Sequence, residues 1–152
     1  MRQLSLFKGK RQRGVTPPPA PEFNSHVIIA DLLRRWGSPR WRWTHIPSGE
    51  HREHRYNNKG QRFSPTGNRL KRMGLVAGFP DFLFFGPERA VRWLELKRKK
   101  LGRVSEDQED IFGQLEACGF RLGEEFLITD DVKEATEWLK AHGILRATIE
   151  VQ

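Results

Sequence analysis

The chain has 152 residues, a net charge of +8 and a single cysteine. This length is enough for one domain with its own hydrophobic core. One cysteine excludes a disulfide within the chain, no apolar run reaches the roughly 20 residues of a membrane span, and the N-terminal segment lacks the apolar centre of a signal peptide. We therefore expect a soluble, cytoplasmic protein without a membrane partner.

The positive charge is concentrated in one part of the chain. Residues 34–72 contain eleven Arg and Lys against two acids, a net charge of +9, whereas residues 101–152 contain five against twelve acids, a net charge of −7. The aromatic residues among these basic ones are Trp36, Trp41, Trp43 and Tyr56. Such a mixture is typical of a nucleic-acid-binding surface. The alternative is a solvated basic face packed on a few core tryptophans.

The first 20 residues are expected to form a flexible, basic, proline-rich arm. They contain five Arg and Lys residues and no acid, and three consecutive prolines at 17–19. This composition resists packing and favours an extended spacer. This N-terminal arm either contacts phosphates or is a mobile tail, and the sequence favours neither. The folded domain is expected over residues 21–152.

A helix is predicted from Pro21 or Glu22 to Trp36, with Gly37 as its end. Its apolar residues recur at roughly helical spacing: Phe23, Val27, Ala30, Leu32 and Leu33.

A strand is predicted around Trp41 and Trp43, which alternate with arginines at the period of two that strands have. Residues 50–68 show no apolar periodicity and contain Gly and Pro, so we expect a basic loop there. A short helix is expected over 69–73, ended by Gly74.

Two apolar segments, 78–85 and 91–97, are joined by the turn-rich residues 86–90, which predicts an antiparallel hairpin. Glu95 and Lys97 are two residues apart and therefore project from the same face of a strand. Asp81 opens the neighbouring strand. We expect these three charged side chains to meet at one end of the hairpin.

Two carboxylates and a backbone carbonyl are ligands that Mg²⁺ or Mn²⁺ prefers. Asp81, Glu95 and the Leu96 carbonyl are thus a candidate metal site, and Lys97 is a candidate for orienting an attacking water. The ordinary alternative is a solvated hairpin that carries a Glu–Lys pair.

The remainder of the chain predicts two helices and a strand. Ser105 and Gln108 have the spacing of a capping box and precede an apolar helical stripe, Ile111, Phe112 and Leu115. Cys118 follows this stripe, and we expect it in the core. A strand is expected over 126–129, then a helix capped by Asp130 or Asp131, then an edge strand within 144–152. The order of these elements predicts an α/β domain with a mixed sheet flanked by helices.

Several residue groups occur in the order found in one nuclease family. They are Gly78-Phe79-Pro80-Asp81, Glu95-Leu96-Lys97, Gly102-Arg103-Val104-Ser105 with Gln108, and upstream Glu22-Phe23 with His26, His45-Ile46-Pro47-Ser48-Gly49-Glu50 and Arg69-Leu70-Lys71-Arg72-Met73-Gly74. From about residue 22 to 142 the chain resembles the VRR-NUC family of the PD-(D/E)XK nuclease superfamily, especially its small stand-alone members from phages and bacteria. It departs at Ser48, where many members have Asn, and in a longer stretch from 55 to 68.

The resemblance implies a restriction-endonuclease-like fold and a set of functional residues. The implied catalytic residues are Asp81, Glu95, Lys97 and Gln108, and the implied metal ligands are Asp81, Glu95, the Leu96 carbonyl and Glu22. Two of these also have an ordinary interpretation. Glu22 is an acid of the kind favoured in the first turn of a helix, and Gln108 suits a helix cap.

Further basic and polar residues are candidates for the substrate surface. The candidate phosphate contacts are Arg52, Arg55, Arg62, Lys99, Lys100 and Arg103. For the last three, a solvated turn is the alternative. Glu50 is a further candidate for the metal site. His45, His51 and His54 lack the fourth ligand of a closed zinc site, so we expect phosphate contacts or plain surface positions for them.

Together these features predict a Mg²⁺- or Mn²⁺-dependent nuclease that hydrolyses DNA phosphodiester bonds. The resemblance implies branched, flapped or four-way DNA as substrate, and symmetric handling of two strands favours a homodimer. The alternative is a non-catalytic nucleic-acid-binding accessory protein, and cleavage of RNA is a third possibility.

Overall fold

The protein is described by a computed structural model over residues 21–47, 55–97 and 104–146. The predicted N-terminal arm, residues 1–20, lies outside these ranges, as do residues 48–54, 98–103 and 147–152.

A four-stranded sheet forms the centre of the molecule, with the strand order β1-β4-β5-β6. The strands are β1 (Arg42–His45), β4 (Phe82–Phe85), β5 (Val91–Leu96) and β6 (Phe126–Thr129). β4 runs antiparallel to both β1 and β5, and β6 runs parallel to β5. The predicted hairpin and mixed sheet are therefore confirmed.

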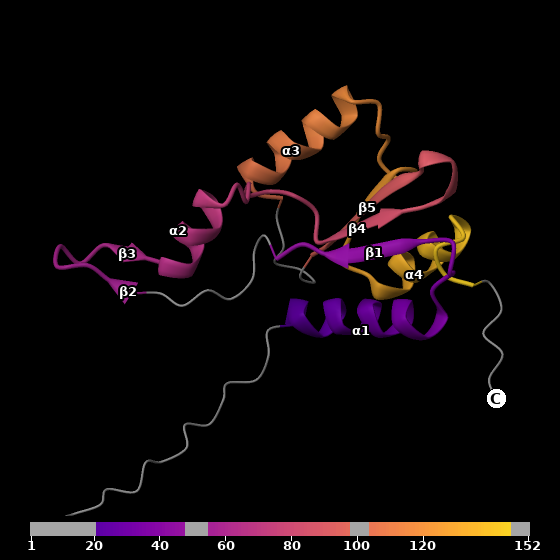
Figure 1. Cartoon of the computed structure of the whole chain (residues 1–152), viewed down its shortest axis with the longest axis horizontal. Coiled ribbons are helices and arrows are strands. Elements are labelled where there is room, and N and C mark those ends of the chain that lie inside the picture. Colours follow the sequence, from indigo (N-terminus) through magenta and orange to yellow (C-terminus); the bar gives the residue numbers. More distant parts are fainter. Residues whose placement is uncertain (1–20, 48–54, 98–103, 147–152) are drawn as a thin grey trace, which may run out of the picture.

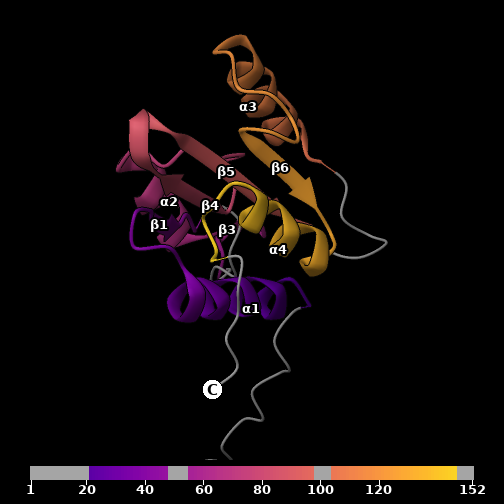
Figure 2. The same ribbon diagram turned by 90° about the vertical axis from the view of Figure 1, so that its right-hand side faces the viewer.

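Helices cover both faces of this sheet (Figure 1, Figure 2). On one face lie α1 (Pro21–Trp36) and α4 (Val132–Ala141), and on the other lies α3 (Glu106–Ala117). The core on the α1 side includes Ile29, Leu33, Phe82, Phe84, Leu94, Leu96, Trp138 and Leu139. The core on the α3 side includes Ile111, Phe112, Leu115 and Phe126, with Trp93 packed against it.

The alternation of strand side chains explains how one strand serves both cores. Leu94 and Leu96 of β5 face α1 and α4, so Glu95 between them faces the opposite side, where α3 lies. Asp131 caps α4 by accepting a hydrogen bond from the backbone N–H of Lys133 at 2.8 Å. Strand alternation therefore places the Glu95 carboxylate on the α3 side of the sheet, near the end of β5.

The predicted basic loop over 50–68 is wrong for residues 55–68. Strands β2 (Arg55–Tyr56) and β3 (Arg62–Phe63) form a separate two-stranded sheet, followed by α2 (Pro65–Arg72). Ser64 caps α2 by accepting a hydrogen bond from the Gly67 N–H at 3.0 Å, and Pro65 occupies the first helical turn. Proline is favoured there because its missing N–H would have no partner within the helix. Figure 1 shows that β2, β3 and α2 project from the body of the molecule, and we call them the projecting arm.

Two smaller expectations also require correction. Cys118 is exposed rather than part of the core, because it is the C-cap residue beyond the buried stripe of α3. Of the edge strand expected within 144–152, only residues 144–146 belong to the described part, where Leu145 makes an isolated antiparallel bridge to Gly37; residues 147–152 lie outside it. No helix in the described part of the chain is long and apolar enough to cross a membrane.

Candidate active site

Asp81 and Glu95 lie at the open end of the β4–β5 hairpin. Phe82 pairs with Leu94, so the residue before β4 lies beside the residue after Leu94. The backbone N–H of Leu96 donates a hydrogen bond of 2.9 Å to Asp81 Oδ2. Asp81 is only 9% exposed and Glu95 only 3%. Two carboxylates are thus held together in a largely water-excluded position.

Glu95 is linked to Lys97 and to Gln108 of α3. Lys97 Nζ lies 2.9 Å from Glu95 Oε1, and Gln108 Nε2 donates a hydrogen bond of 2.5 Å to the same oxygen. Lys97 Nζ also donates to Gln108 Oε1. The structure therefore brings together the four residues that the resemblance implies for catalysis, while their roles stay predictions.

Gln108 also makes the capping contact, so the helix cap and the contacts to Glu95 and Lys97 occur in the same geometry. Its Oε1 accepts a hydrogen bond of 3.1 Å from the Ser105 N–H, and Ser105 Oγ accepts one of 3.3 Å from the Gln108 N–H. This is the reciprocal capping box that the spacing predicts. The cap fixes the side chain whose amide reaches Glu95.

Gly78 allows the first turn of α3 to approach the site. Its φ is +93°, and a Cβ at this position would lie 2.2 Å from the Asp107 carbonyl oxygen and 3.0 Å from the Gln108 backbone nitrogen. Only glycine fits a position with both a left-handed backbone and so close a backbone neighbour. The segment that leads to Asp81 therefore packs directly on the turn that carries Gln108.

Burial raises the pKa of Glu95 from its ordinary value of 4.5 to about 7, and the nearby charge of Asp81 adds to this effect. Lys97 and Gln108 act in the opposite direction but do not offset the loss of water. Glu95 Oε2 is buried and has no hydrogen-bond partner among the described residues. A divalent cation would satisfy this oxygen and relieve the repulsion between the carboxylates, so the residues present fit a hard metal ion.

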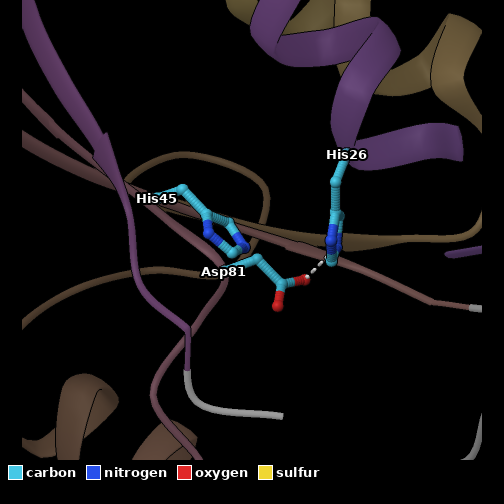
Figure 3. A group of neighbouring side chains, drawn as sticks. All are labelled: His26, His45 and Asp81. Atoms are coloured by element: carbon cyan, nitrogen blue, oxygen red, sulfur yellow. Dashed lines mark ion pairs between the residues drawn. The ribbon is translucent and has the colours of Figure 1, made fainter. Parts of the chain in front are cut away.

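Two histidines lie on the other side of Asp81. His26 Nε2, from α1, lies 3.1 Å from Asp81 Oδ2, and His45 ends β1, where it pairs with Phe82. Figure 3 shows both imidazoles beside the Asp81 carboxylate. Sequence spacing does not indicate that His26 reaches this site, because a helix and a strand end are brought together only by the fold. The signal for His26 is its place, with Glu22 and Phe23, among the residue groups of the resemblance. His45 is half-buried against Phe82 rather than in a plain surface position, because it ends one strand beside the start of the next.

The remaining candidates are more dispersed or lie outside the described residues. Arg55 and Arg62 are exposed on β2 and β3, in the projecting arm. Glu22 belongs to the first turn of α1, and its side chain lies outside the described part. Also outside it are Arg52, Lys99, Lys100, Arg103, Ser48, Glu50, His51 and His54.

Comparison of the chain with models of protein families, with curated proteins and with solved structures gave no match. The resemblance to the VRR-NUC family therefore rests on the residue groups in the sequence and stays a prediction.

Proposed function

We propose that the protein is a Mg²⁺- or Mn²⁺-dependent nuclease that hydrolyses DNA phosphodiester bonds. The observation that carries this proposal is the buried Glu95 carboxylate. One of its oxygens is bonded by Lys97 and Gln108, the other has no hydrogen-bond partner in the described part of the chain, and Asp81 lies nearby. A solvated hairpin with an ordinary Glu–Lys pair does not account for acids this deeply buried.

In this proposal Asp81, Glu95 and the Leu96 carbonyl hold the metal ion. When bound, the ion supplies a Lewis acid and lowers the pKa of a coordinated water. Lys97 donates hydrogen bonds from Nζ, which suits orienting the attacking water or stabilising charge on the phosphate. Gln108 holds Lys97 and Glu95 in fixed relation, because its amide donates to the carboxylate and accepts from the ammonium.

The charge of the projecting arm supports DNA as the substrate. Its residues, 55–72, include no acid and six basic residues: Arg55, Lys59, Arg62, Arg69, Lys71 and Arg72. Phosphate contacts of this kind supply affinity without reading sequence. Branched, flapped or four-way DNA and a homodimer are the finer parts of the proposal, and they rest on the resemblance alone.

The rival proposal is a non-catalytic nucleic-acid-binding protein. Buried acids argue against it, because carboxylates beside a basic surface repel phosphate and give a simple binder no advantage.

The test is incubation of the purified protein with linear, nicked, flapped and four-way DNA, and with RNA, in Mg²⁺, Mn²⁺ or EDTA. We expect cleavage of DNA with either ion and none in EDTA. Asp81→Ala is expected to abolish cleavage while retaining DNA affinity, because phosphate contacts elsewhere provide most of the binding. Cleavage at the wild-type rate by Asp81→Ala would overturn the assignment.

A further inference from the structure

We propose that His26, His45 and Asp81 form a second metal site, selective for a transition ion such as Zn²⁺ over Mg²⁺. The ligand atoms of these three residues lie within 4.8 Å of one another. This site goes beyond the proposed nuclease function and does not depend on it, since ion binding is measured without any cleavage.

The site is built from three separate elements. His26 lies on α1, His45 is the last residue of β1, and Asp81 immediately precedes β4. Residues so far apart in the chain meet because α1 packs on the sheet, and His26 lies at the end of the sheet where His45 of β1 pairs with Phe82 of β4. In Figure 3 the Asp81 side chain lies between the two rings, with one carboxylate oxygen toward His26 and the other pointing away from both rings.

The two imidazoles are held in place by the core. The side chain of Phe82 is fully buried. It makes edge contacts with both rings, with centroid distances of 5.8 Å to His26 and 5.3 Å to His45. The Ile46 N–H donates a hydrogen bond of 2.7 Å to the Asp81 carbonyl and so joins the ends of β1 and β4. Ligands held on rigid elements bind an ion without first being ordered.

The donor set determines which ion the site takes. Two imidazole nitrogens and one carboxylate leave positions open for water, and this combination suits Zn²⁺ or Co²⁺ rather than Mg²⁺, which prefers oxygen ligands. A hollow of about 200 Å³ lies beside the rings. It is lined by His26, His45, Phe82, Trp43, Ala30 and Arg34.

Asp81 is the only residue that both proposed sites share. Glu95, Lys97 and Gln108 lie toward α3, whereas His26 comes from α1 on the other side of the sheet. The two sites therefore separate experimentally. A change at Glu95 removes an oxygen ligand of the first site and leaves the three ligands of the second intact.

The test measures Zn²⁺ and Co²⁺ binding by competition with a chromogenic chelator, in a background where His51 and His54 are replaced by Gln so that these imidazoles do not contribute. We expect His26→Gln and His45→Gln each to weaken binding of both ions at least about tenfold. The matched control is His142→Gln, which removes an imidazole elsewhere. It is expected to retain the background affinity.

Thermal unfolding establishes that each variant is folded. A second measurement needs no variant at the site: the Co²⁺-loaded background protein should show two contact-shifted imidazole N–H resonances by NMR.

Unchanged affinity in the two histidine variants, or the absence of those resonances, would overturn the proposal and leave His26 and Asp81 as an ordinary pair. Zn²⁺ binding without DNA cleavage would refute only the nuclease function, and cleavage without Zn²⁺ binding would refute only this site.

Discussion

Gln108 is the residue that connects helix capping with the candidate active site. Its carbonyl oxygen accepts from the Ser105 N–H and from Lys97, and its amide nitrogen donates to Glu95. The side-chain amide offers both a donor and an acceptor here without adding charge. A carboxylate at this position could cap the helix but could not donate to Glu95.

We therefore expect Gln108→Glu to retain the cap and to reduce cleavage by at least about tenfold. The added negative charge beside Asp81 and Glu95 repels phosphate, and it also costs stability at neutral pH. Ser105→Ala is the matched control, since it weakens the cap by about 1 kcal/mol and leaves the Glu95 contact. Cleavage rates and thermal unfolding of the two variants check this. Equal rates for Gln108→Glu and the wild type would contradict an active-site role.

The raised pKa of Glu95 predicts how stability depends on pH in metal-free protein. The folded state holds this proton up to about pH 7, whereas the unfolded chain releases it near 4.5. Because the folded state binds more protons in this window, the contribution of Glu95 to stability falls as pH rises through it, by at most about 3 kcal/mol.

Denaturant unfolding in EDTA across this pH window measures the effect, and Glu95→Gln should remove this part of the slope. Above the window, added Mg²⁺ should raise the stability of the wild type more than that of Glu95→Gln. An identical pH profile for the two proteins in EDTA would show that Glu95 does not titrate in this range.

At the scale of whole elements, the position of α3 depends on Gly78. A side chain there would collide with the backbone of Asp107 in the first turn of the helix. We expect Gly78→Ala to destabilise the fold by about 1–3 kcal/mol and to reduce cleavage, because α3 and Gln108 must move away from Glu95.

Two glycines provide matched controls for this substitution. Gly119 has the same φ of +93° but no atom within 4 Å of an added Cβ, so Gly119→Ala measures the backbone strain alone. Gly113→Ala in α3, also without a close neighbour, is expected to stabilise the helix by up to about 1 kcal/mol. Normal cleavage by a folded Gly78→Ala protein would contradict the proposed coupling.

Some of these helices and strands can be predicted from the sequence, and others cannot. The α1, α3 and α4 helices and the β4–β5 hairpin follow from apolar periodicity, caps and a turn-rich link. The β2–β3 sheet does not, because its four residues contain two arginines and show no apolar alternation. In the sequence Pro65 indicates a loop, whereas in the structure it is the first residue of α2.

The candidate site likewise contains some residues whose proximity can be predicted from the sequence and others whose proximity cannot. Glu95 and Lys97 are neighbours through strand spacing, and Asp81 joins them through the hairpin, so local patterns are sufficient to predict their proximity. The approach of His26 depends on how α1 packs on the sheet. Sequence spacing carries no information on that packing.

At the scale of the whole molecule, positive charge is concentrated in the projecting arm and negative charge in residues 101–152. If the projecting arm binds DNA, Arg55→Gln with Arg62→Gln should flatten the plot of log affinity against log salt by about 0.9 for each phosphate that is no longer neutralised. Arg121→Gln is the matched control, because Arg121 is exposed and pairs with Glu124 and Glu125. Fluorescence anisotropy over a range of salt concentrations gives the slopes. A slope unchanged by the double substitution would move the binding surface away from the projecting arm.

The ion pair between Lys97 and Glu95 has a consequence for the order in which ligands arrive. With both acids ionised, Asp81, Glu95 and Lys97 together carry one net negative charge, so the site repels a phosphodiester until a divalent cation reverses that sign. In the proposed nuclease a bound cation would also neutralise Glu95 and leave the Lys97 ammonium available to the substrate. The proposal therefore implies an order, with the cation bound first and the scissile phosphate second. DNA held by the projecting arm in the absence of the cation would stay outside the site.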